Sequence, residues 1–389
     1  MAKRRLRLGM VGGGQGAFIG GVHRIAARID DQYELVAGAF SADPDRARAS
    51  AADLHVDPDR AYGSYREMAE AEAARADRID AVAVVTPNDS HHPICRAFLD
   101  RGIPVICDKP LTTNLADALD LVRAVRSSGL PFVLTHNYTG HPMVRQARAM
   151  VAAGELGAIR VVQVEYAQEW LATRLEESGQ KQAAWRTDPA RSGPAGAIGD
   201  IGTHAHNIAA FVSGLALEQL AADVSTFVPG RRVDDNATML LRYAGGARGA
   251  LWCSQVAAGH ENGLRLRVYG EKASLDWAQE HPNQLRFARV GEAPQILGRA
   301  TPGLTPEAAH ATRVPAGHPE GYLEAFAQIY ADAAELLRAH QEKRAPAPAA
   351  TLVPTVEDGA RGVKFVEAAL ESAKRGGAWV PASLDLAAP

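Results

Sequence analysis

Short apolar runs alternate with helical stretches over the first third of the chain. The runs are LRLGMVG, YELVAGAF, AVAVVT, VICDK and PFVLTHN, and alanine- and arginine-rich segments such as DPDRARASAADL lie between them. In those segments apolar residues recur at helical spacing, and Asp, Ser or Asn stands where helices should begin. Strands that alternate with helices are typical of a parallel sheet covered on both faces. Residues 1–136 are therefore predicted to form an α/β domain with a doubly wound parallel sheet.

The pattern changes after Gly157. Strand-like runs now follow one another across glycine turns and polar loops, namely IRVVQVEYAQEW, LAADVSTFV, NATMLLRYAGG, ARGALWCSQVA, LRLRVYG and QLRFARV. Consecutive strands with few helices between them indicate a mostly antiparallel sheet. Two helices, roughly 319–340 and 355–375, should cover a face of one domain, and RAPAPAATLVP between them should be an extended connector. Residues 137–389 are thus predicted to form an α+β domain with a large open sheet.

The composition allows two domains and argues against a polyanionic partner. The 389 residues are 47% hydrophobic and 22% charged, which is enough to bury full cores. The 42 basic and 45 acidic residues are well mixed and leave a formal net charge of −3, so neither nucleic acid nor a membrane surface is expected as a partner. The first apolar run breaks into glycine too early for a signal sequence or a membrane span. Three widely spaced cysteines in apolar surroundings favour reduced thiols and a cytoplasmic location; they are Cys95, Cys107 and Cys253.

A glycine-rich turn, VGGGQGAFIGGVH (residues 11–23), follows the first predicted strand and precedes a helix. Strand, glycine turn and helix in this order are typical of a Rossmann dinucleotide-binding domain, where Gly12 and Gly14 would let a pyrophosphate approach the backbone N–H groups. The usual spacing places a small residue at Ala17, whereas Gly20 fits only if the loop carries three extra residues. The alternative, a glycine turn without a ligand, is disfavoured by this context. In either register the residues expected near the phosphates include Gln15, Ala17, Phe18 and Ile19.

The ends of the next two strands supply candidate contacts for the rest of a dinucleotide. After the second strand, FSADPDR offers Ser41 and Arg46 where such folds carry an acid for a ribose hydroxyl or an arginine for a 2′-phosphate. Because Ala42 and not an arginine follows Ser41, NAD is expected, with NADP possible. His91 and His92 cannot both point into one small site, and His91 is expected to reach the cofactor. The end of the third strand adds Thr86, Pro87 and Asn88.

Two further segments carry chemistry. ICDKPL (residues 106–111) places Asp108 and Lys109 at the carboxyl edge of the sheet, near the expected position of the nicotinamide, and the following proline restricts the lysine backbone. GPAGAIGDIGTHAHN (residues 193–207) leads into a helix on which Asp200 and His204, four apart, share one face. A zinc cluster with His206 is the alternative. Histidines two apart project in different directions, unlike a zinc-binding i, i+4 pair, so no metal is expected.

These segments resemble the oxidoreductase family grouped with glucose-fructose oxidoreductase and inositol dehydrogenase. That family carries a Glu-Lys-Pro signature with the lysine in its active site, and this chain has Asp108 in place of the glutamate. The family's second signature is a glycine-rich turn followed by Asp, Gly and His, usually with a further aspartate where this chain has Asn207. The resemblance covers nearly the whole chain, including THNY (residues 135–138), and is closest to dehydrogenases of inositols and unusual aldohexoses.

The resemblance implies hydride transfer between NAD and a ring carbon of a cyclic polyol or sugar, such as scyllo-inositol or L-glucose, which becomes a keto-sugar. His204 would be the base, Asp200 would orient it or bind a neighbouring hydroxyl, and Lys109 would stabilise alkoxide charge. Further cofactor contacts would be Asp108, Lys109 and Asn137. Aromatic faces with polar neighbours suit a sugar ring, so the expected substrate contacts are Lys109, Tyr138, Gln168, Trp170, Trp185, Arg186, Asp200 and His204.

The resemblance also implies an assembly, and two other functions stay open. In the wider family the exposed sheet of the second domain packs against another subunit, so a homodimer or homotetramer is expected. The loop ATRLEESGQKQAAW is long enough to be a lid or a subunit arm. One alternative function is the redox step of a glycoside-cleaving pathway that oxidises C3 of a glycoside. The other is a non-catalytic NADP-binding regulator, against which the presence of Lys109, Asp200 and His204 argues.

Overall fold

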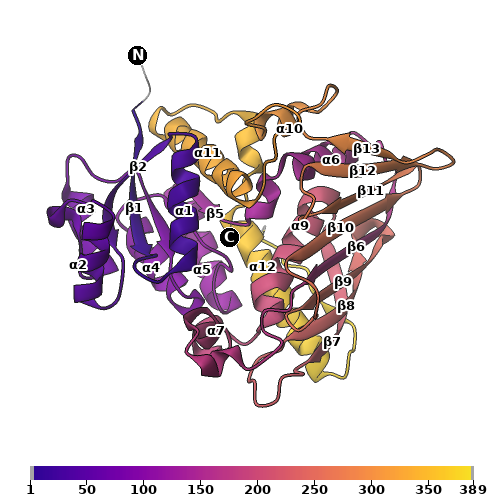
Figure 1. Cartoon of the computed structure of the whole chain (residues 1–389), viewed down its shortest axis with the longest axis horizontal. Coiled ribbons are helices and arrows are strands. Elements are labelled where there is room, and N and C mark those ends of the chain that lie inside the picture. Colours follow the sequence, from indigo (N-terminus) through magenta and orange to yellow (C-terminus); the bar gives the residue numbers. More distant parts are fainter. Residues whose placement is uncertain (1–3, 387–389) are drawn as a thin grey trace. The chain divides into compact units, whose positions relative to one another are not determined.

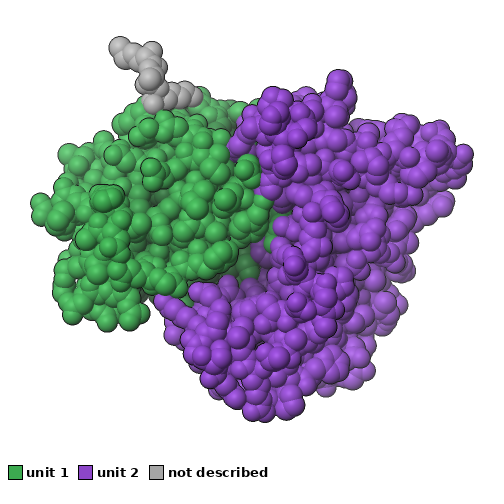
Figure 2. All heavy atoms as spheres, viewed as in Figure 1, with its two compact units in different colours: residues 1–112, 116–140, 322–359 green, residues 113–115, 141–321, 360–389 purple. Residues whose placement is uncertain are grey.

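The structure is a computed structural model that describes residues 4–386. The chain divides into two compact units, whose residues Figure 2 distinguishes by colour. Unit 1 comprises residues 1–112, 116–140 and 322–359, and unit 2 comprises residues 113–115, 141–321 and 360–389. Unit 1 therefore includes a segment from near the end of the chain. Among residues 4–386, no helix is long and apolar enough to cross a membrane.

Unit 1 contains a five-stranded parallel sheet in the order β2-β1-β3-β4-β5, of which Figure 1 labels β2, β1 and β5. Its strands are β1 (Leu6–Gly12), β2 (Tyr33–Ala39), β3 (Ala81–Val85), β4 (Val105–Cys107) and β5 (Phe132–Leu134). The helices after the first four strands are α1 (Phe18–Ile29), α2 (Pro44–Asp53), α3 (Tyr65–Ala74), α4 (His91–Leu99) and α5 (Leu115–Ser128). Leu8 and Met10 join a core with α1, while a Cβ at Gly9 between them would meet Met68 of α3. Helices thus cover both faces, as predicted.

A helix from near the end of the chain, α11 (Tyr322–Gln341), completes this core. Its residues Phe326, Tyr330 and Ala333 are buried together with Val22 and Ala26 of α1. The connector that follows was expected to be extended, and this prediction is wrong over part of its length. It contains the short 3₁₀ helix η7 (Pro348–Leu352), and Ala350 within it is buried.

Unit 2 is built on a nine-stranded sheet in the order β13-β12-β11-β10-β6-β9-β8-β7-β14. Within this sheet, among the strand pairs of the described residues, only β6 and β9 pair in parallel, so the predicted mostly antiparallel sheet and the fold class are confirmed. The strands are β6 (Ile159–Ala167), β7 (Leu217–Ser225), β8 (Asn236–Tyr243), β9 (Arg248–Ser254), β10 (Gly263–Gly270), β11 (Ala273–Ala278), β12 (Gln284–Arg289), β13 (Gln295–Gly298) and β14 (Val380–Pro381).

Helices cover one face of this sheet. Along β6, Val162, Val164 and Tyr166 are buried, and α9 packs against β6 and β10, while α6 packs against β11 and β12. Gln163, which alternates with them, is exposed on the other face. The helices with residues in unit 2 are α6 (Pro142–Ala152), α7 (Lys181–Arg186), α8 (Pro189–Ser192), α9 (Thr203–Ser213), α10 (Pro306–His310) and α12 (Val356–Lys374).

The segment ATRLEESGQKQAAW, predicted to be a lid or a subunit arm, is bonded near its start by the side chain of Arg231. It folds into the 3₁₀ helix η4 (Leu175–Ser178) and α7 instead of one long loop. The side chain of Arg231 is 1% exposed, pairs with Glu176 at 3.0 Å, and donates to the carbonyl oxygens of Leu171 and Thr173 at 2.8 and 2.9 Å. Charged hydrogen bonds of this kind contribute about 1.5–3 kcal/mol each when buried, so this part of the segment is anchored.

The contact between α1 and the glycine turn predicts the effect of two neighbouring substitutions. A Cβ at Gly20 would overlap the backbone of Gly13, whereas a Cβ at Gly21 would meet nothing within 4 Å. We expect Gly20→Ala to lower the free energy of unfolding by about 1–3 kcal/mol through overpacking and to weaken NADH binding. Gly21→Ala, the control, should be neutral or slightly stabilising. Thermal unfolding and NADH fluorescence titration measure both effects, and equal behaviour of the two variants would contradict the close contact.

Candidate functional site

The glycine turn of unit 1 forms a cradle without side chains. Gly12 and Gly13 have φ values of +80° and +71°, which favour glycine. A Cβ at Gly12 would lie 2.6 Å from Thr86 Cγ2, and one at Gly14 would lie 2.6 Å from Ser50 Oγ. The helix α1 begins at Phe18 with no side-chain cap and no acidic residue in its first turn. An uncapped helix N-terminus behind a glycine turn suits a pyrophosphate, because its N–H groups and dipole favour an anion.

The extra-residue register is the one consistent with this geometry. In it Gly20 takes the place where α1 meets the turn closely, and Ala17 is the N-cap residue, whose N–H donates to Gly14 O at 3.0 Å. The side chain of Gln15 is not directed at the expected phosphate position, because its Nε2 donates to Asp53 Oδ2 at 2.7 Å. Phe18 and Ile19 open the helix, and the side chain of Phe18 is largely exposed.

The end of β2 is organised by an aspartate. Asp43 accepts hydrogen bonds from the backbone N–H groups of Asp45 and Arg46 at 3.0 and 3.1 Å and caps α2. The N–H of Arg46 lowers the pKa of Asp43, so the carboxylate is ionised near neutral pH. Ser41 accepts from the N–H of Asp43 at 3.1 Å. The candidate ribose-binding segment therefore carries a fixed negative charge and, in Arg46, an exposed positive one.

His91 is tied to the backbone instead of pointing outward. The residue is fully buried at the start of α4. Its Nδ1 lies 2.8 Å from Pro110 O and its Nε2 lies 2.9 Å from Thr86 O. Both ring nitrogens therefore lie within hydrogen-bond distance of backbone carbonyl oxygens that follow two strands. His91 joins the turn after Lys109 to the segment of Thr86, Pro87 and Asn88, and any contact with the cofactor would have to use its ring carbons.

A largely buried carboxylate at the end of β4, whose side chain is 14% exposed, fixes the backbone of Lys109. Asp108 Oδ1 accepts from the N–H of Lys109 at 2.9 Å and from Thr135 Oγ1, at the end of β5, at 2.8 Å. Burial alone would raise the pKa of Asp108, but the neighbouring His23 and the positive charge of Lys109 outweigh it, so this pKa lies well below its usual range. The carboxylate is ionised and rigidly held, and the Lys109–Pro110 peptide bond is cis.

The residues after β5 include an amide that fits a ligand. Asn137 is 2% exposed in the 3₁₀ helix η3 (Asn137–Gly140), and its Nδ2 has no hydrogen-bond partner among the described residues. A buried donor without an acceptor costs about 1–3 kcal/mol, so this position fits an acceptor group of a bound cofactor. Tyr138 is also buried, and its ring lies 6.4 Å from that of Tyr322.

In unit 2, Asp200 and His204 lie on a widened helical turn. The segment Ile198–Gly202 is π-helical and runs directly into α9, and His204 is 7% exposed with its ring 6.2 Å from that of Tyr166. Asp234 holds the start of this turn, because its carboxylate accepts from the N–H groups of Gly196 and Ile198 at 2.6 and 2.9 Å. Burial raises the pKa of Asp234 to about 6. Asp234 was not anticipated from the sequence.

Two side chains hold the carboxylate of Asp200. Gln255 Nε2 donates to Asp200 Oδ2 at 2.9 Å, and Arg186 Nε lies 3.4 Å from the same oxygen. The guanidinium of Arg186 also lies 4.3 Å from the centre of the Trp185 ring, so the structure places Trp185 and Arg186 together in α7. Gln255 is 2% exposed and was missed. A single glutamine directly after a strand carries no sequence signature, and its position at the end of β9 was the only signal.

The other predicted substrate contacts lie at the end of β6. Asn262 Oδ1 accepts from Tyr166 Oη at 2.7 Å and from Gln168 Nε2 at 2.8 Å, which fixes the amide of Gln168. Trp170, two residues further, is partly exposed.

His206 stacks on Phe365 with ring centres 4.6 Å apart, and burial lowers its pKa to about 4. Across residues 4–386 no three His, Cys, Asp or Glu side chains are grouped to hold a metal.

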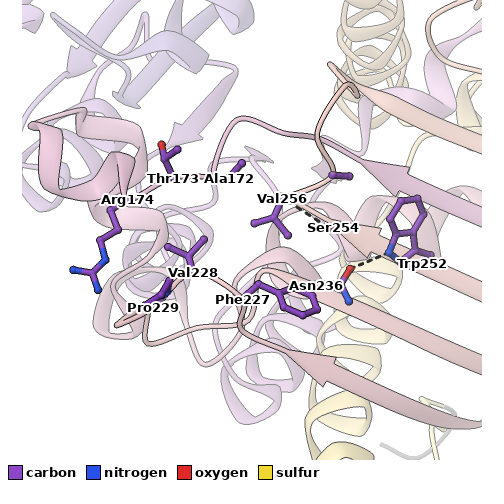
Figure 3. A pocket seen from close by; sticks show the side chains of 11 residues that line it. Ala172, Thr173, Arg174, Phe227, Val228, Pro229, Asn236, Trp252, Ser254 and Val256 are labelled. Carbon is purple, nitrogen blue, oxygen red and sulfur yellow. Dashed lines mark hydrogen bonds between the residues drawn. The ribbon is translucent and has the colours of Figure 1, made fainter.

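A cavity of about 620 Å³ opens elsewhere on unit 2 (Figure 3). It is lined by residues that include Trp252, whose Nε1 donates to Asn236 Oδ1 at 3.0 Å. Ser254 and Val256 also line it, whereas the side chain of Gln255 between them bonds Asp200. Successive side chains of an extended segment point to opposite sides. This cavity is therefore on the far side of the segment from Asp200 and contains none of the predicted catalytic residues.

Models of known protein families match a segment in each of the two units. Residues 6–138 match the model described as oxidoreductase family, NAD-binding Rossmann fold, and residues 144–276 match the GFO/IDH/MocA C-terminal domain. The chain is thus an oxidoreductase with an NAD-binding domain. It belongs to the GFO/IDH/MocA family, since it is 35% identical over 378 residues to the uncharacterized oxidoreductase YfiI of Bacillus subtilis, with 96% of each chain covered.

Two solved structures resemble the whole chain. An oxidoreductase from Sinorhizobium meliloti is 52% identical with a TM-score of 0.89, and the match covers 97% of this chain and 100% of that one. An inositol dehydrogenase homologue from Azotobacter vinelandii, complexed with NADH and myo-inositol, is 39% identical with a TM-score of 0.90, and the match covers 97% and 98%. The family predicted from the two sequence signatures is confirmed, and so is NAD as the cofactor of the Rossmann domain.

The hydrogen bond between Gln255 and Asp200 predicts that substitution of Gln255 lowers the activity of the enzyme. Gln255→Leu keeps the size of the side chain but removes the donor to Asp200 Oδ2, so the carboxylate should lose its fixed orientation. We expect kcat/KM for the substrate to fall about tenfold or more. Ser254→Ala, the adjacent change on the cavity side, is the control and should retain activity. Loss in both variants, or in neither, would contradict this role of Gln255.

Proposed function

We propose that the protein is an NAD-dependent dehydrogenase that transfers a hydride between the nicotinamide and a ring hydroxyl carbon of a cyclic polyol or sugar. Inositols such as scyllo-inositol, and aldohexoses such as L-glucose that are oxidised to keto-sugars, are the proposed substrates. The observation that carries the proposal is the Asp200 carboxylate, held by Gln255 and Arg186 four residues before His204. The Azotobacter homologue complexed with NADH and myo-inositol supports the substrate class.

The proposed mechanism assigns one task to each catalytic residue. The nicotinamide, when bound, supplies the hydride acceptor. His204 takes the hydroxyl proton, because an imidazole suits a general base near neutral pH. Lys109 stabilises the negative charge that develops on the oxygen as the proton leaves. Asp200 accepts a hydrogen bond from a neighbouring hydroxyl or from the ring of His204, and its fixed oxygen gives that bond a direction.

The proposed substrate contacts share the chemistry of sugar recognition. Trp170 and Trp185 offer flat apolar faces. Gln168, whose Nε2 bonds Asn262, offers its amide oxygen as an acceptor, and Arg186 offers donors beside Asp200. Tyr138 is proposed as a further contact on the grounds of its position after β5. Preorganised donors lose little entropy on binding and can therefore discriminate between hydroxyl arrangements.

We also propose that the protein is a homodimer or homotetramer whose subunits meet through the unit 2 sheet. The face of that sheet opposite the helices carries Leu240, Tyr269 and Ile296, which are 56%, 39% and 59% exposed. Exposed large apolar side chains on one sheet face suit association between subunits. A monomeric mass in light scattering would contradict this proposal.

A panel of inositols and of D- and L-hexoses, assayed at 340 nm with NAD and with NADP, tests the proposed function. We expect turnover of at least one member, with kcat/KM higher for NAD by about tenfold or more, because the ionised Asp43 would repel a 2′-phosphate. A tenfold preference for NADP would instead show that Arg46 binds that phosphate. Binding of NADH without turnover of any member would favour a regulator, and cleavage of glycosides without net NADH would favour the redox step of glycoside breakdown.

Lys109 is expected to act on chemistry and not on folding. Lys109→Ala should keep the fold and most of the NADH affinity but lose most of kcat, since the missing charge matters chiefly in the transition state. Lys181→Ala, at the start of α7 where the lysine is exposed, is the matched control and should behave as wild type. Steady-state kinetics and NADH titration measure both. A decrease of only a few-fold in kcat would reduce Lys109 to a cofactor contact.

His204 and Asp200 should differ in which kinetic constant they change. His204→Ala should lose on the order of 10²- to 10⁴-fold in the rate of oxidation, the range for removal of a general base. Asp200→Ala should also be slow and should have a raised KM for the polyol, because a hydroxyl contact is lost. In the wild type, kcat/KM for oxidation should rise with pH through one ionisation that is absent from the residual activity of His204→Ala. If that variant keeps the rise, Lys109 becomes the leading candidate for the base.

A further inference from the structure

A buried histidine in α1 has no task in this mechanism. His23 is completely buried, and its ring packs edge-on against Phe326 and Tyr330 of α11, with ring centres 4.7 and 5.8 Å apart. Its neighbours on the buried face of α1 are apolar and include Val22, Ala26 and Ala27. A polar ring in an apolar core costs free energy unless its nitrogens have partners. Packing alone therefore gives no reason for a histidine at this position.

Tyr330 lies within hydrogen-bond distance of one ring nitrogen of His23. His23 Nδ1 lies 2.8 Å from Tyr330 Oη. Burial raises the pKa of Tyr330 far above its ordinary value, and the charge of Asp108 raises it further, so the hydroxyl stays protonated. A hydroxyl that donates to Nδ1 leaves the ring proton on Nε2 in the neutral imidazole. The edge of the ring that carries this N–H is the positive one.

That edge faces the carboxylate next to Lys109. His23 Nε2 has no hydrogen-bond partner among the described residues and lies 3.9 Å from Asp108 Oδ1. The same oxygen accepts from the N–H of Lys109 and from Thr135 Oγ1. His23 is also the first of the groups that lower the pKa of Asp108 against the effect of burial. The chain Tyr330, His23, Asp108 thus ends at the backbone of the lysine.

We propose that His23 is a positioning residue: oriented by Tyr330, it holds the Asp108 carboxylate in the place that fixes the backbone of Lys109. The inference rests on the proposed function in that Lys109 acts on the substrate. His23 touches neither substrate nor reacting atoms, and its effect on the reaction passes through Asp108. A small displacement of a catalytic group far from the substituted residue is enough to slow a reaction.

Two substitutions at His23 separate its polarity from its volume. His23→Phe keeps a ring against Phe326 and removes both nitrogens, while His23→Gln keeps an amide N–H near the position of Nε2. We expect kcat of His23→Phe to fall about 10- to 100-fold, with KM and the Kd of NADH changed by less than about threefold. His23→Gln should recover much of this loss. Loss of kcat by less than about threefold in folded His23→Phe would overturn the proposal.

The tyrosine pair of unit 1 supplies a matched control. Tyr330→Phe removes the hydroxyl that bonds His23. Tyr33→Phe removes a hydroxyl that donates to the backbone oxygen of Tyr330 at 2.9 Å and has no bond to His23 or Asp108. We expect kcat to fall in Tyr330→Phe and to stay at the wild-type value in Tyr33→Phe. These two variants also decide the question if His23→Phe does not fold, and equal kcat values in both would overturn the proposal.

Crystal structures test the proposal without any substrate. In His23→Phe or Tyr330→Phe the carboxylate of Asp108 should turn away from the N–H of Lys109, and in Tyr33→Phe it should stay. If the wild type oxidises no member of the polyol panel, the proposed function fails. A displaced Asp108 in these structures would still support the role of His23, and an undisturbed one would overturn it.

Discussion

The largely buried, ionised carboxylate of Asp108 forms the interaction on which the candidate site of unit 1 depends. It lies at the end of the short strand β4, where a charge is costly unless it is bonded. Its oxygen joins the backbone of Lys109 to Thr135 of the neighbouring strand. One acid therefore fixes both a lysine and the relative position of two strand ends. Rigidity at this point comes from electrostatics and not from the length of the strand, since β4 and β5 have only three residues each.

Two adjacent acids play a comparable part in unit 2, but they are stabilised differently. Asp234 is bonded by backbone N–H groups of the turn before Asp200, and its pKa is raised because burial outweighs those bonds. Asp235 accepts from the N–H groups of Phe227 and Val228 and lies 3.4 Å from Arg231. The turn that carries Asp200 and the segment held by Arg231 are thus anchored at one dipeptide. Movement of either would disturb the other.

The sequence pattern was sufficient for the fold class, and it supplied the candidate catalytic residues. The order of strand-like and helical runs distinguished the parallel sheet from the antiparallel one, and two signatures gave Lys109, Asp200 and His204 as candidates. The partners that hold those residues were not predictable, because Gln255 and Asp234 are single polar residues beside strands and become significant only when distant segments meet. His23 stood at core spacing in a helix, so its pattern matched that of an apolar residue. The pattern also gave no sign that α11 belongs to unit 1, because α11 is distant along the chain from the strands and helices that it packs against.

The parallel pairing of β6 with β9 in an otherwise antiparallel sheet bears on how unit 2 assembles. Strands β7, β8 and β9 follow one another along the chain and pair as neighbours, and so do β10, β11, β12 and β13. Each of these groups can form by pairing of strands that are close in sequence. Pairing of β6 with β9 or with β10 requires closure of a long loop. The first strand of the sheet, β6, and the last, β14, therefore both pair with partners that are distant along the chain. Because β6 pairs with β10 on one side and with β9 on the other, its hydrogen bonds join the two groups into one sheet and leave neither group with an open edge at that position.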